Sequence, residues 1–136
     1  MSVNRDLIRY RLEKARETLE DAELLLSQNR LSSAVNRLYY SLFYGVLALL
    51  ETKGLASSKH AGVRALFNQH FVKDNIVSKE LGQFYGELFN ERQEGDYVDY
   101  TEFAREKVVE DMKKCQTFLV KLEQAVDMLL RRETEQ

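Results

Sequence analysis

The stretch Leu38-Tyr-Tyr-Ser-Leu-Phe-Tyr-Gly-Val-Leu-Ala-Leu-Leu50 decides the fold of this chain. It spans 13 residues, and only Ser41 and Gly45 interrupt its apolar and aromatic side chains. It lies inside a predicted helix from about Ser32 to Lys53, and a helix that is apolar around most of its circumference belongs in the centre of a domain. The stretch is well short of the roughly 20 residues that cross a bilayer. We therefore expect a buried central helix in a soluble protein.

Two long helices with a single apolar stripe are predicted at the two ends of the sequence, from about Asn4 to Gln28 and from about Thr101 to Arg131. Their apolar residues alternate four and three positions apart, which places them on one face of a helix. The stripes are Ile8, Leu12, Ala15, Leu19, Ala22 and Leu26 in the first helix, and Val108, Met112, Cys115, Leu119, Leu122, Val126 and Leu129 in the last. Each stripe predicts packing against the central helix.

Two shorter helices are predicted in the middle of the chain. One runs from Lys59 to about Lys73 after the possible caps Ser57 and Ser58, and the other runs from a cap at Ser78 to about Glu94. Turn signals separate the predicted helices at Asn29-Arg30, Gly54, Asp74-Asn75 and Gly95-Asp96.

The absence of proline from all 136 residues favours long helices over sheets, which need frequent turns. We predict an all-α fold, an antiparallel up-and-down bundle of four to five helices. It forms a single domain over residues 1–136, with a disordered tail from about residue 132.

The net charge and the cysteine content argue against several classes of protein. The formal net charge is −2, whereas a general nucleic-acid binder is usually strongly basic. Cys115 is the only cysteine, which excludes an intrachain disulfide, and no Cys/His spacing suggests zinc. The N-terminal residues contain no apolar segment like that of a signal peptide. We expect a cytoplasmic protein with no metal site and no cofactor.

Most of the reactive side chains gather in one segment, Arg92-Gln-Glu-Gly-Asp96-Tyr97, where the fourth predicted helix ends. In a structural interpretation, Arg92 pairs with Asp96 or a neighbouring helix and Tyr97 covers the end of the bundle. In a functional interpretation, Arg92 holds a phosphate group and a polar neighbour moves a proton. Arg92, Asp96 and Tyr97 are therefore the candidate catalytic residues.

The charges around this segment weigh against binding of free RNA. Between residues 87 and 102 there are six acids and one base, a net charge of −5, and such a field repels polyphosphate. Basic groups near the N-terminus could offset it. These are Arg5, Arg9, Arg11, Lys14 and Arg16.

Arg37 and the pair Lys59-His60 are candidate nucleotide- or RNA-binding residues. Arg37 precedes the aromatic run, and its guanidinium needs a carboxylate or a ligand phosphate because it does not lose its proton. A salt bridge to the acidic segment is the simpler of the two expectations. His60 stands at a predicted helix start, where a structural role is common, and the same holds for His70 later in that helix.

A series of short motifs resembles the HEPN domain, named for higher eukaryotes and prokaryotes nucleotide-binding. The motifs are Ala34-Val-Asn-Arg37-Leu-Tyr39-Tyr40-Ser-Leu-Phe43, Lys59-His60-Ala-Gly62, Phe67 with Phe71-Val-Lys73, and Arg92-Gln-Glu-Gly-Asp96-Tyr97. The resemblance is greatest to the small single-domain prokaryotic members and covers nearly the whole chain, to about Leu130.

This resemblance implies a bundle of four or five helices that often forms a homodimer. Many such proteins are encoded beside a minimal nucleotidyltransferase in a toxin–antitoxin-like pair. In active members the dimer is a metal-independent endoribonuclease whose motif is an arginine, four to six residues, and a histidine. The histidine moves protons at the ribose 2′-hydroxyl, and the arginine stabilises charge on the phosphorane.

The chain departs from that motif at its second position. Arg92 matches the arginine, but Tyr97 stands where a histidine is expected. An unperturbed tyrosine has a pKa near 10 and is a poor base at neutral pH. His60 could replace the histidine if the fold brings it near. Tyr97 or Tyr100 also resembles the tyrosine that partner nucleotidyltransferases modify with AMP.

Three functions follow from these observations. The leading hypothesis is a HEPN-type homodimer that partners a nucleotidyltransferase and binds nucleotide or RNA near Arg92. The alternative is a ribonuclease toxin with a degenerate motif of Arg92 and Tyr97, supported by Asp96 or His60. The third is a non-catalytic helical adaptor.

Overall fold

The computed structural model describes residues 3–97 and 102–135, without the side chains of residues 93–97 and 135. Its elements are α1 (Arg5–Ser27), α2 (Leu31–Glu51), α3 (His60–Phe67), the π-helical turn η1 (Asn68–Val72), α4 (Lys79–Tyr97) and α5 (Arg105–Glu135). No strand occurs in this part of the chain. The predicted all-α fold is confirmed.

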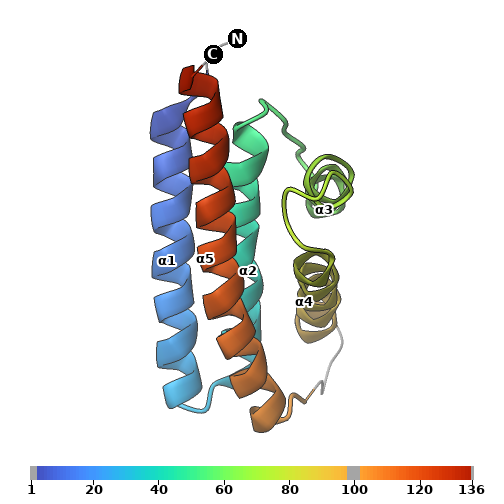
Figure 1. The fold of residues 1–136 in the computed structure, drawn as a ribbon. Coiled ribbons are helices and arrows are strands. Elements are labelled where there is room, and N and C mark those ends of the chain that lie inside the picture. The colour runs from blue at the N-terminus through green and yellow to red at the C-terminus, as the bar shows by residue number, and fades with distance from the viewer. Residues whose placement is uncertain (1–2, 98–101, 136) are drawn as a thin grey trace.

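Three long helices lie side by side, and α1 runs in the opposite direction to α2 and α5 (Figure 1). The shorter α3 and α4 cover the other side of α2 and are seen nearly end-on in this view, so they lie across the long helices. Helix α2 contacts α1, α3, α4 and α5. The helix that contains Leu38–Leu50 is therefore central, as its composition predicts.

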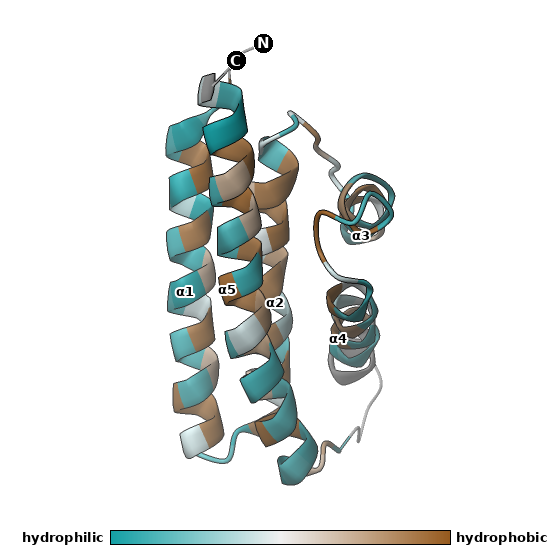
Figure 2. Cartoon of the chain, in the orientation of Figure 1, coloured by the Kyte–Doolittle hydropathy of each residue, from teal (hydrophilic) through white to brown (hydrophobic). Residues whose placement is uncertain are grey.

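The apolar faces of the helices point toward one another, and polar residues colour the outer face of α1 (Figure 2). Both predicted stripes line this core, and Leu38, Leu42 and Leu49 of α2 are fully buried within it. At Gly45 the side chains of α5 pack directly against the backbone of α2. A β-carbon at Gly45 would lie 3.0 Å from a methyl group of Leu122, so the glycine allows the two helices to pack tightly.

Local hydrogen bonds begin and end the helices where the sequence predicts turns. Asn4 caps α1 by accepting a hydrogen bond from the Leu7 N–H at 2.9 Å, and Ser78 accepts one from the Leu81 N–H at 3.1 Å. Asn29, Gly54 and Asn75 have positive φ angles of 56°, 65° and 60°. After each of the three, backbone hydrogen bonds close the helix end in the Schellman pattern.

Several predicted boundaries are wrong. Helix α4 continues through Gly95 to Tyr97, because one glycine weakens a helix by only about 1 kcal/mol and does not end it. The third predicted helix changes at Asn68 into the π-helical turn, and the last begins at Arg105. Residues 132–135, predicted as a disordered tail, continue α5.

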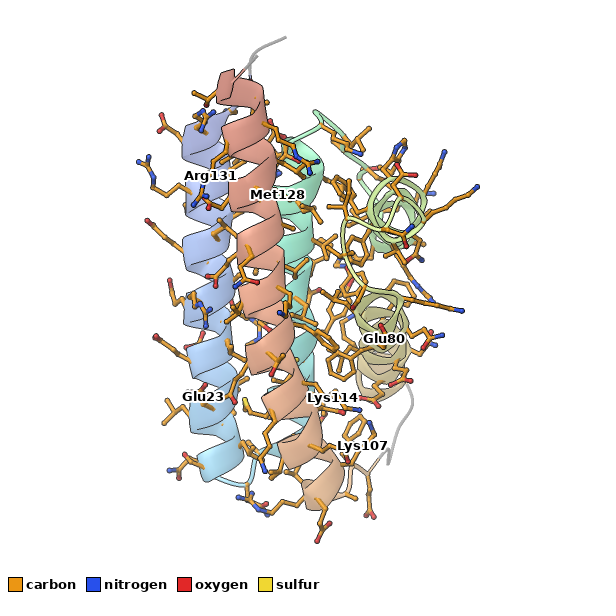
Figure 3. All side chains as sticks on the ribbon, viewed as in Figure 1. Glu23, Glu80, Lys107, Lys114, Met128 and Arg131 are labelled. Atoms are coloured by element: carbon orange, nitrogen blue, oxygen red, sulfur yellow. The ribbon has the colours of Figure 1, made fainter. Side chains whose placement is uncertain are left out.

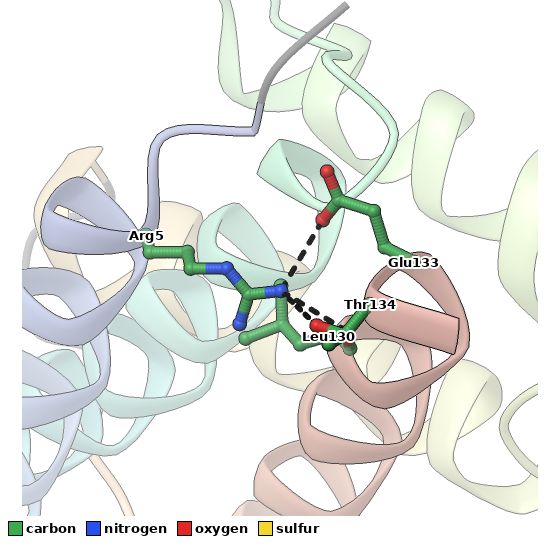
Figure 4. Close-up of polar contacts among 4 residues, drawn as sticks. All are labelled: Arg5, Leu130, Glu133 and Thr134. Carbon is green, nitrogen blue, oxygen red and sulfur yellow. Dashed lines mark hydrogen bonds and ion pairs between the residues drawn. The ribbon is translucent and has the colours of Figure 1, made fainter. Parts of the chain in front are cut away.

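A clasp of polar contacts holds the start of α1 against the end of α5 (Figure 4). The Arg5 guanidinium donates to the Leu130 carbonyl at 3.1 Å and to the Thr134 hydroxyl at 2.8 Å, and lies 3.6 Å from a Glu133 carboxylate oxygen. These contacts join the first turn of α1 to the last two turns of α5. In the described part of the chain, no helix combines the length and apolar character that a membrane span requires.

Candidate functional site

Three of the residues that the sequence predicts for the site come from three different helices and meet at one place, and a fourth lies directly beside it. We define the Arg92 cluster as Arg37, Tyr39 and Tyr40 of α2, His60 of α3 and Arg92 of α4. Of the predicted residues, Arg37, His60 and Arg92 belong to the cluster, and Lys59 precedes His60 as an exposed residue. The side chains of α2, α3 and α4 fill the space between these helices (Figure 3).

Tyr39 forms the buried base of the cluster, with no solvent exposure. Its hydroxyl lies 2.8 Å from Nδ1 of His60 and 3.5 Å from the hydroxyl of Tyr85. The guanidinium carbon Cζ of Arg92 lies 5.0 Å from the centre of the Tyr39 ring, which is a cation–π distance. Burial is the main cause that raises the pKa of Tyr39, so the phenol keeps its proton.

Two guanidinium groups lie at cation–π distance from the ring of Tyr40. Arg37 lies with Cζ 5.0 Å from the ring centre, and Arg92 lies with Cζ 5.8 Å from it. Arg37 also donates two hydrogen bonds to the Asn36 side chain, at 3.1 and 2.7 Å. Among the described residues it forms no ion pair, so the salt bridge expected from the sequence is not found there. Two guanidinium groups, the side chains best suited to bind phosphate through paired N–H groups, therefore lie beside one ring.

His60 is held between aromatic rings at the first turn of α3. It stacks on Phe43 with ring centres 4.5 Å apart and meets the Tyr40 ring edge-on at 5.6 Å. Burial, and then the positive charge of Arg92, lower the pKa of His60 below its ordinary 6.5. The imidazole is therefore neutral at pH 7, and it adds polar nitrogen atoms to the cluster without adding charge.

The remaining predicted residues lie outside this geometry. Asp96 and Tyr97 occupy the last turn of α4, but their side chains, like all of Tyr100, lie outside the described residues. Cys115 is fully buried, as its place on the apolar stripe predicts. In the part of the chain that the structure describes, no three His, Cys, Asp or Glu side chains gather as a metal site would require.

A sequence profile of the HEPN domain matches residues 8–126. This chain belongs to the HEPN family. A "UPF0332 protein" of Thermotoga maritima is 49% identical over 131 residues, which cover 96% of this chain and 99% of that protein. The "Putative toxin MJ0142" of Methanocaldococcus jannaschii is 39% identical over 110 residues, covering 81% of this chain and 75% of the other. The "Putative toxin MJ0605" of the same organism is 35% identical over 94 residues, covering 69% and 70%.

Arg64 lies beside the Arg92 cluster and is a basic residue that the sequence pattern did not single out. It lies one helical turn after His60, with Cζ 5.4 Å from the centre of the Phe89 ring. A β-carbon at Gly86 would lie only 2.4 Å from its terminal nitrogen, so this glycine makes room for the guanidinium. The spacing of four residues from His60 was the available signal, because such residues share a helix face.

A second polar cluster anchors α4 of the HEPN domain to the start of α5. The ammonium group of Lys107, labelled in Figure 3, lies 2.7 Å from Oδ1 of Asp111 and 3.9 Å from Oε1 of Glu91. Asp111 is 1% exposed, so its charge is held inside the protein. Glu91 therefore faces Lys107 and Asp111 and does not act as one of six free acids beside Arg92.

The basic residues near the N-terminus do not supply the offset considered from the sequence. Arg11 lies 3.8 Å from Glu51, and Arg16 binds Glu123 through two nitrogen atoms. Arg5 lies in the clasp to α5, and Arg9 and Lys14 pair with acids on α1 itself, so all five basic residues have acidic partners. The positive charge at and beside the Arg92 cluster comes from Arg37, Arg64 and Arg92 instead.

Glu91→Gln is expected to change how stability depends on pH. Burial first, and then the negative charge of Asp111, raise the pKa of Glu91 from 4.5 to about 7, against the effect of Lys107. Because the pKa of Glu91 is higher in the folded protein than in the unfolded one, Glu91 stabilises the fold fully below the unfolded pKa. This contribution to the unfolding free energy is lost as the pH rises through about 7. Between about pH 5 and about pH 8, the unfolding free energy of Glu91→Gln should therefore rise by about 1 kcal/mol relative to that of wild type. This figure allows for solvent screening.

The measurement is urea unfolding of both proteins at the two pH values. The matched control is Glu110→Gln, because Glu110 pairs with Lys114 on the exposed surface of α5. A pH-independent difference between wild type and Glu91→Gln would contradict the raised pKa.

Proposed function

We propose that this HEPN protein, whose relatives include proteins named as toxins, binds the phosphate groups of a nucleotide or RNA at the Arg92 cluster. The observation that carries the proposal is the placement of Arg37 and Arg92 on the same tyrosine ring, 5.0 and 5.8 Å from its centre. Both groups are permanently charged, and charge-assisted hydrogen bonds from guanidinium groups to phosphate are among the strong ones in proteins. A guanidinium also matches phosphate geometry through paired N–H groups.

The aromatic side chains of the site support a nucleotide more than a simple anion. Tyr40, Phe43 and Tyr44 are half-buried and lie within 6.2 Å of one another by ring centres. Half-exposed aromatic rings offer surfaces on which bases stack, with little dependence on sequence. The net charge of −2 fits a small local site and not a long basic groove.

The direct test is fluorescence anisotropy of a labelled single-stranded RNA oligonucleotide, with unlabelled ATP as competitor. We expect saturable binding that ATP reverses. The affinity should depend only weakly on salt, because about two phosphate contacts give a slope near −1.4 in a plot of log K against log salt. A slope several times steeper would show binding along a broad surface, and absence of binding to folded protein would refute the proposal.

One observation favours a second candidate function, a metal-independent endoribonuclease. His60 and Arg92 contact the same two rings, Tyr39 and Tyr40, although they come from different helices. His60 could then act where the family motif has a histidine and this chain has Tyr97. Cleavage of a mixed RNA in the presence of a chelator, lost in His60→Gln, would support this candidate over binding alone.

We also propose that the chain acts as a homodimer beside a minimal nucleotidyltransferase. The support is the HEPN membership and the resemblance to small members of such pairs. Light scattering should give twice the monomer mass of 15.9 kDa. A monomer at micromolar concentration would exclude a site shared between two copies, while the RNA titration would still test the Arg92 cluster of one copy.

A further inference from the structure

The hydroxyl groups of Tyr39 and Tyr85 form a short chain of hydrogen bonds that ends at His60. Both tyrosine side chains are fully buried. The Tyr39 hydroxyl lies 2.8 Å from Nδ1 of His60, and 3.5 Å from the hydroxyl of Tyr85. Burial raises the pKa of both phenols, so each oxygen carries one hydrogen to place.

Only one arrangement gives both buried hydrogens an acceptor. If Tyr39 donates to Nδ1 of His60, Tyr85 can donate to the Tyr39 oxygen, and both O–H groups are satisfied. If Nδ1 carried a hydrogen and donated to Tyr39, Tyr39 would donate to Tyr85. The hydrogen of Tyr85 would then be buried without an acceptor among the described residues, which is costly.

The other ring nitrogen of His60 remains open. Nε2 has no hydrogen-bond partner in the described part of the chain, and it is not among the buried nitrogen atoms that lack one, so solvent reaches it. A neutral imidazole with an acceptor at Nδ1 carries its hydrogen on Nε2. The accessible nitrogen is then an N–H group.

We propose that Tyr39, with Tyr85 behind it, fixes His60 as the Nε2–H tautomer, so that His60 offers a hydrogen-bond donor and not a base. Tyr39 is thus a positioning residue for His60. The further role of that N–H, donation to an oxygen of the phosphate held by Arg37 and Arg92, rests on the function proposed above. The tautomer also opposes the ribonuclease candidate, because an Nε2–H nitrogen has no lone pair to accept a proton.

The tautomer is measured without any ligand by long-range ¹H–¹⁵N NMR of the full chain with labelled histidine. His70 gives the second set of signals, and His70→Gln assigns them. In wild type we expect Nδ1 of His60 at the shift of an unprotonated nitrogen and Nε2 at that of a protonated one. In Tyr39→Phe, which keeps the buried ring, the two nitrogens should move toward averaged shifts.

Tyr40→Phe is the matched control for the tautomer. The Tyr40 ring contacts His60 edge-on at 5.6 Å, but its hydroxyl makes no hydrogen bond to His60. The tautomer should therefore be unchanged in Tyr40→Phe. A hydrogen on Nδ1 in wild type, or identical spectra in wild type and Tyr39→Phe, would overturn the proposal.

The donor role has its own test with inorganic pyrophosphate and the RNA oligonucleotide as probes. Glutamine can place an N–H donor near the position of Nε2 but is not a base, whereas leucine offers neither. His60→Gln should bind within a few-fold of wild type, and His60→Leu should bind roughly tenfold more weakly. Equal losses in the two variants would overturn the donor role. Absence of binding by wild type would refute the phosphate site itself, and the NMR result would still decide the tautomer.

Discussion

Arg92→Ala should weaken RNA binding by about 10- to 100-fold, the largest effect expected from any single change at the site. A hydrogen bond to a charged group contributes about 1.5–3 kcal/mol, which corresponds to that range of affinity. Arg92→Lys should recover only part of the loss. Lysine keeps the charge but not the planar group that lies over Tyr39 and Tyr40. The measurement is the anisotropy titration of the labelled oligonucleotide.

Stability must be measured alongside, because Arg92 is only 8% exposed. A buried guanidinium stacked on two rings contributes more than a surface residue, so Arg92→Ala should also lose about 1–2 kcal/mol of unfolding free energy. Arg92→Met separates the two effects, since methionine restores apolar packing without charge. It should recover stability and leave binding weak.

Arg131→Ala is the matched control for the arginine series. Arg131 lies on α5, with a side chain that is 75% exposed and paired with Asp127. Its removal should change RNA affinity by less than about twofold, as expected of a charge that touches no phosphate. Equal affinity of wild type and folded Arg92→Ala would remove Arg92 from the binding site and leave it a structural residue.

Phe67→Ala should destabilise the protein by about 3–5 kcal/mol, the cost of a large cavity in a closed core. Phe67 is fully buried at the end of α3 and meets the Tyr85 ring edge-on, with ring centres 5.5 Å apart. Helix α3 has only eight residues, too few to be stable by itself. Its packing through Phe67 therefore holds His60 in place.

Urea unfolding followed by circular dichroism measures this loss. Phe118→Ala is the control, because Phe118 of α5 is half-buried and packs against Phe84 of α4, with ring centres 5.5 Å apart. It should cost about 1 kcal/mol, since solvent already reaches the ring. Equal losses for the two variants would show that α3 adds little to the stability of the fold.

The framework of the fold could be predicted from the sequence because it depends on periodicity. The stripes on α1 and α5 and the apolar circumference of α2 each determine which face is buried. Helices end at Asn29, Gly54 and Asn75, which all adopt the left-handed conformation. Because glycine and asparagine favour that conformation, the residue types themselves predict these helix ends. Gly95 gave a false signal, because glycine permits a helix end without requiring one.

The site could be predicted only in part, because it is assembled from separate helices. Arg37 was recognised from the difficulty of burying an arginine, and Arg92 from the reactive side chains in its segment, and both lie in the cluster. The contact between Tyr39 and His60 joins residues 21 positions apart, and no local pattern indicates it. The pairing of Glu91 with Lys107 is equally invisible in the sequence, so the charge near Arg92 was overestimated.

The clasp at Arg5 has a consequence for the order in which the chain folds. Its hydrogen bonds join residues 125 and 129 positions apart, so they close almost the largest loop the chain can form. The entropy lost on loop closure rises with loop length, and contacts of high sequence separation form slowly. Helices α1 and α2, joined by a short turn, can pair first. On the ribosome, the face of α1 that α5 covers stays exposed until the last helix has emerged.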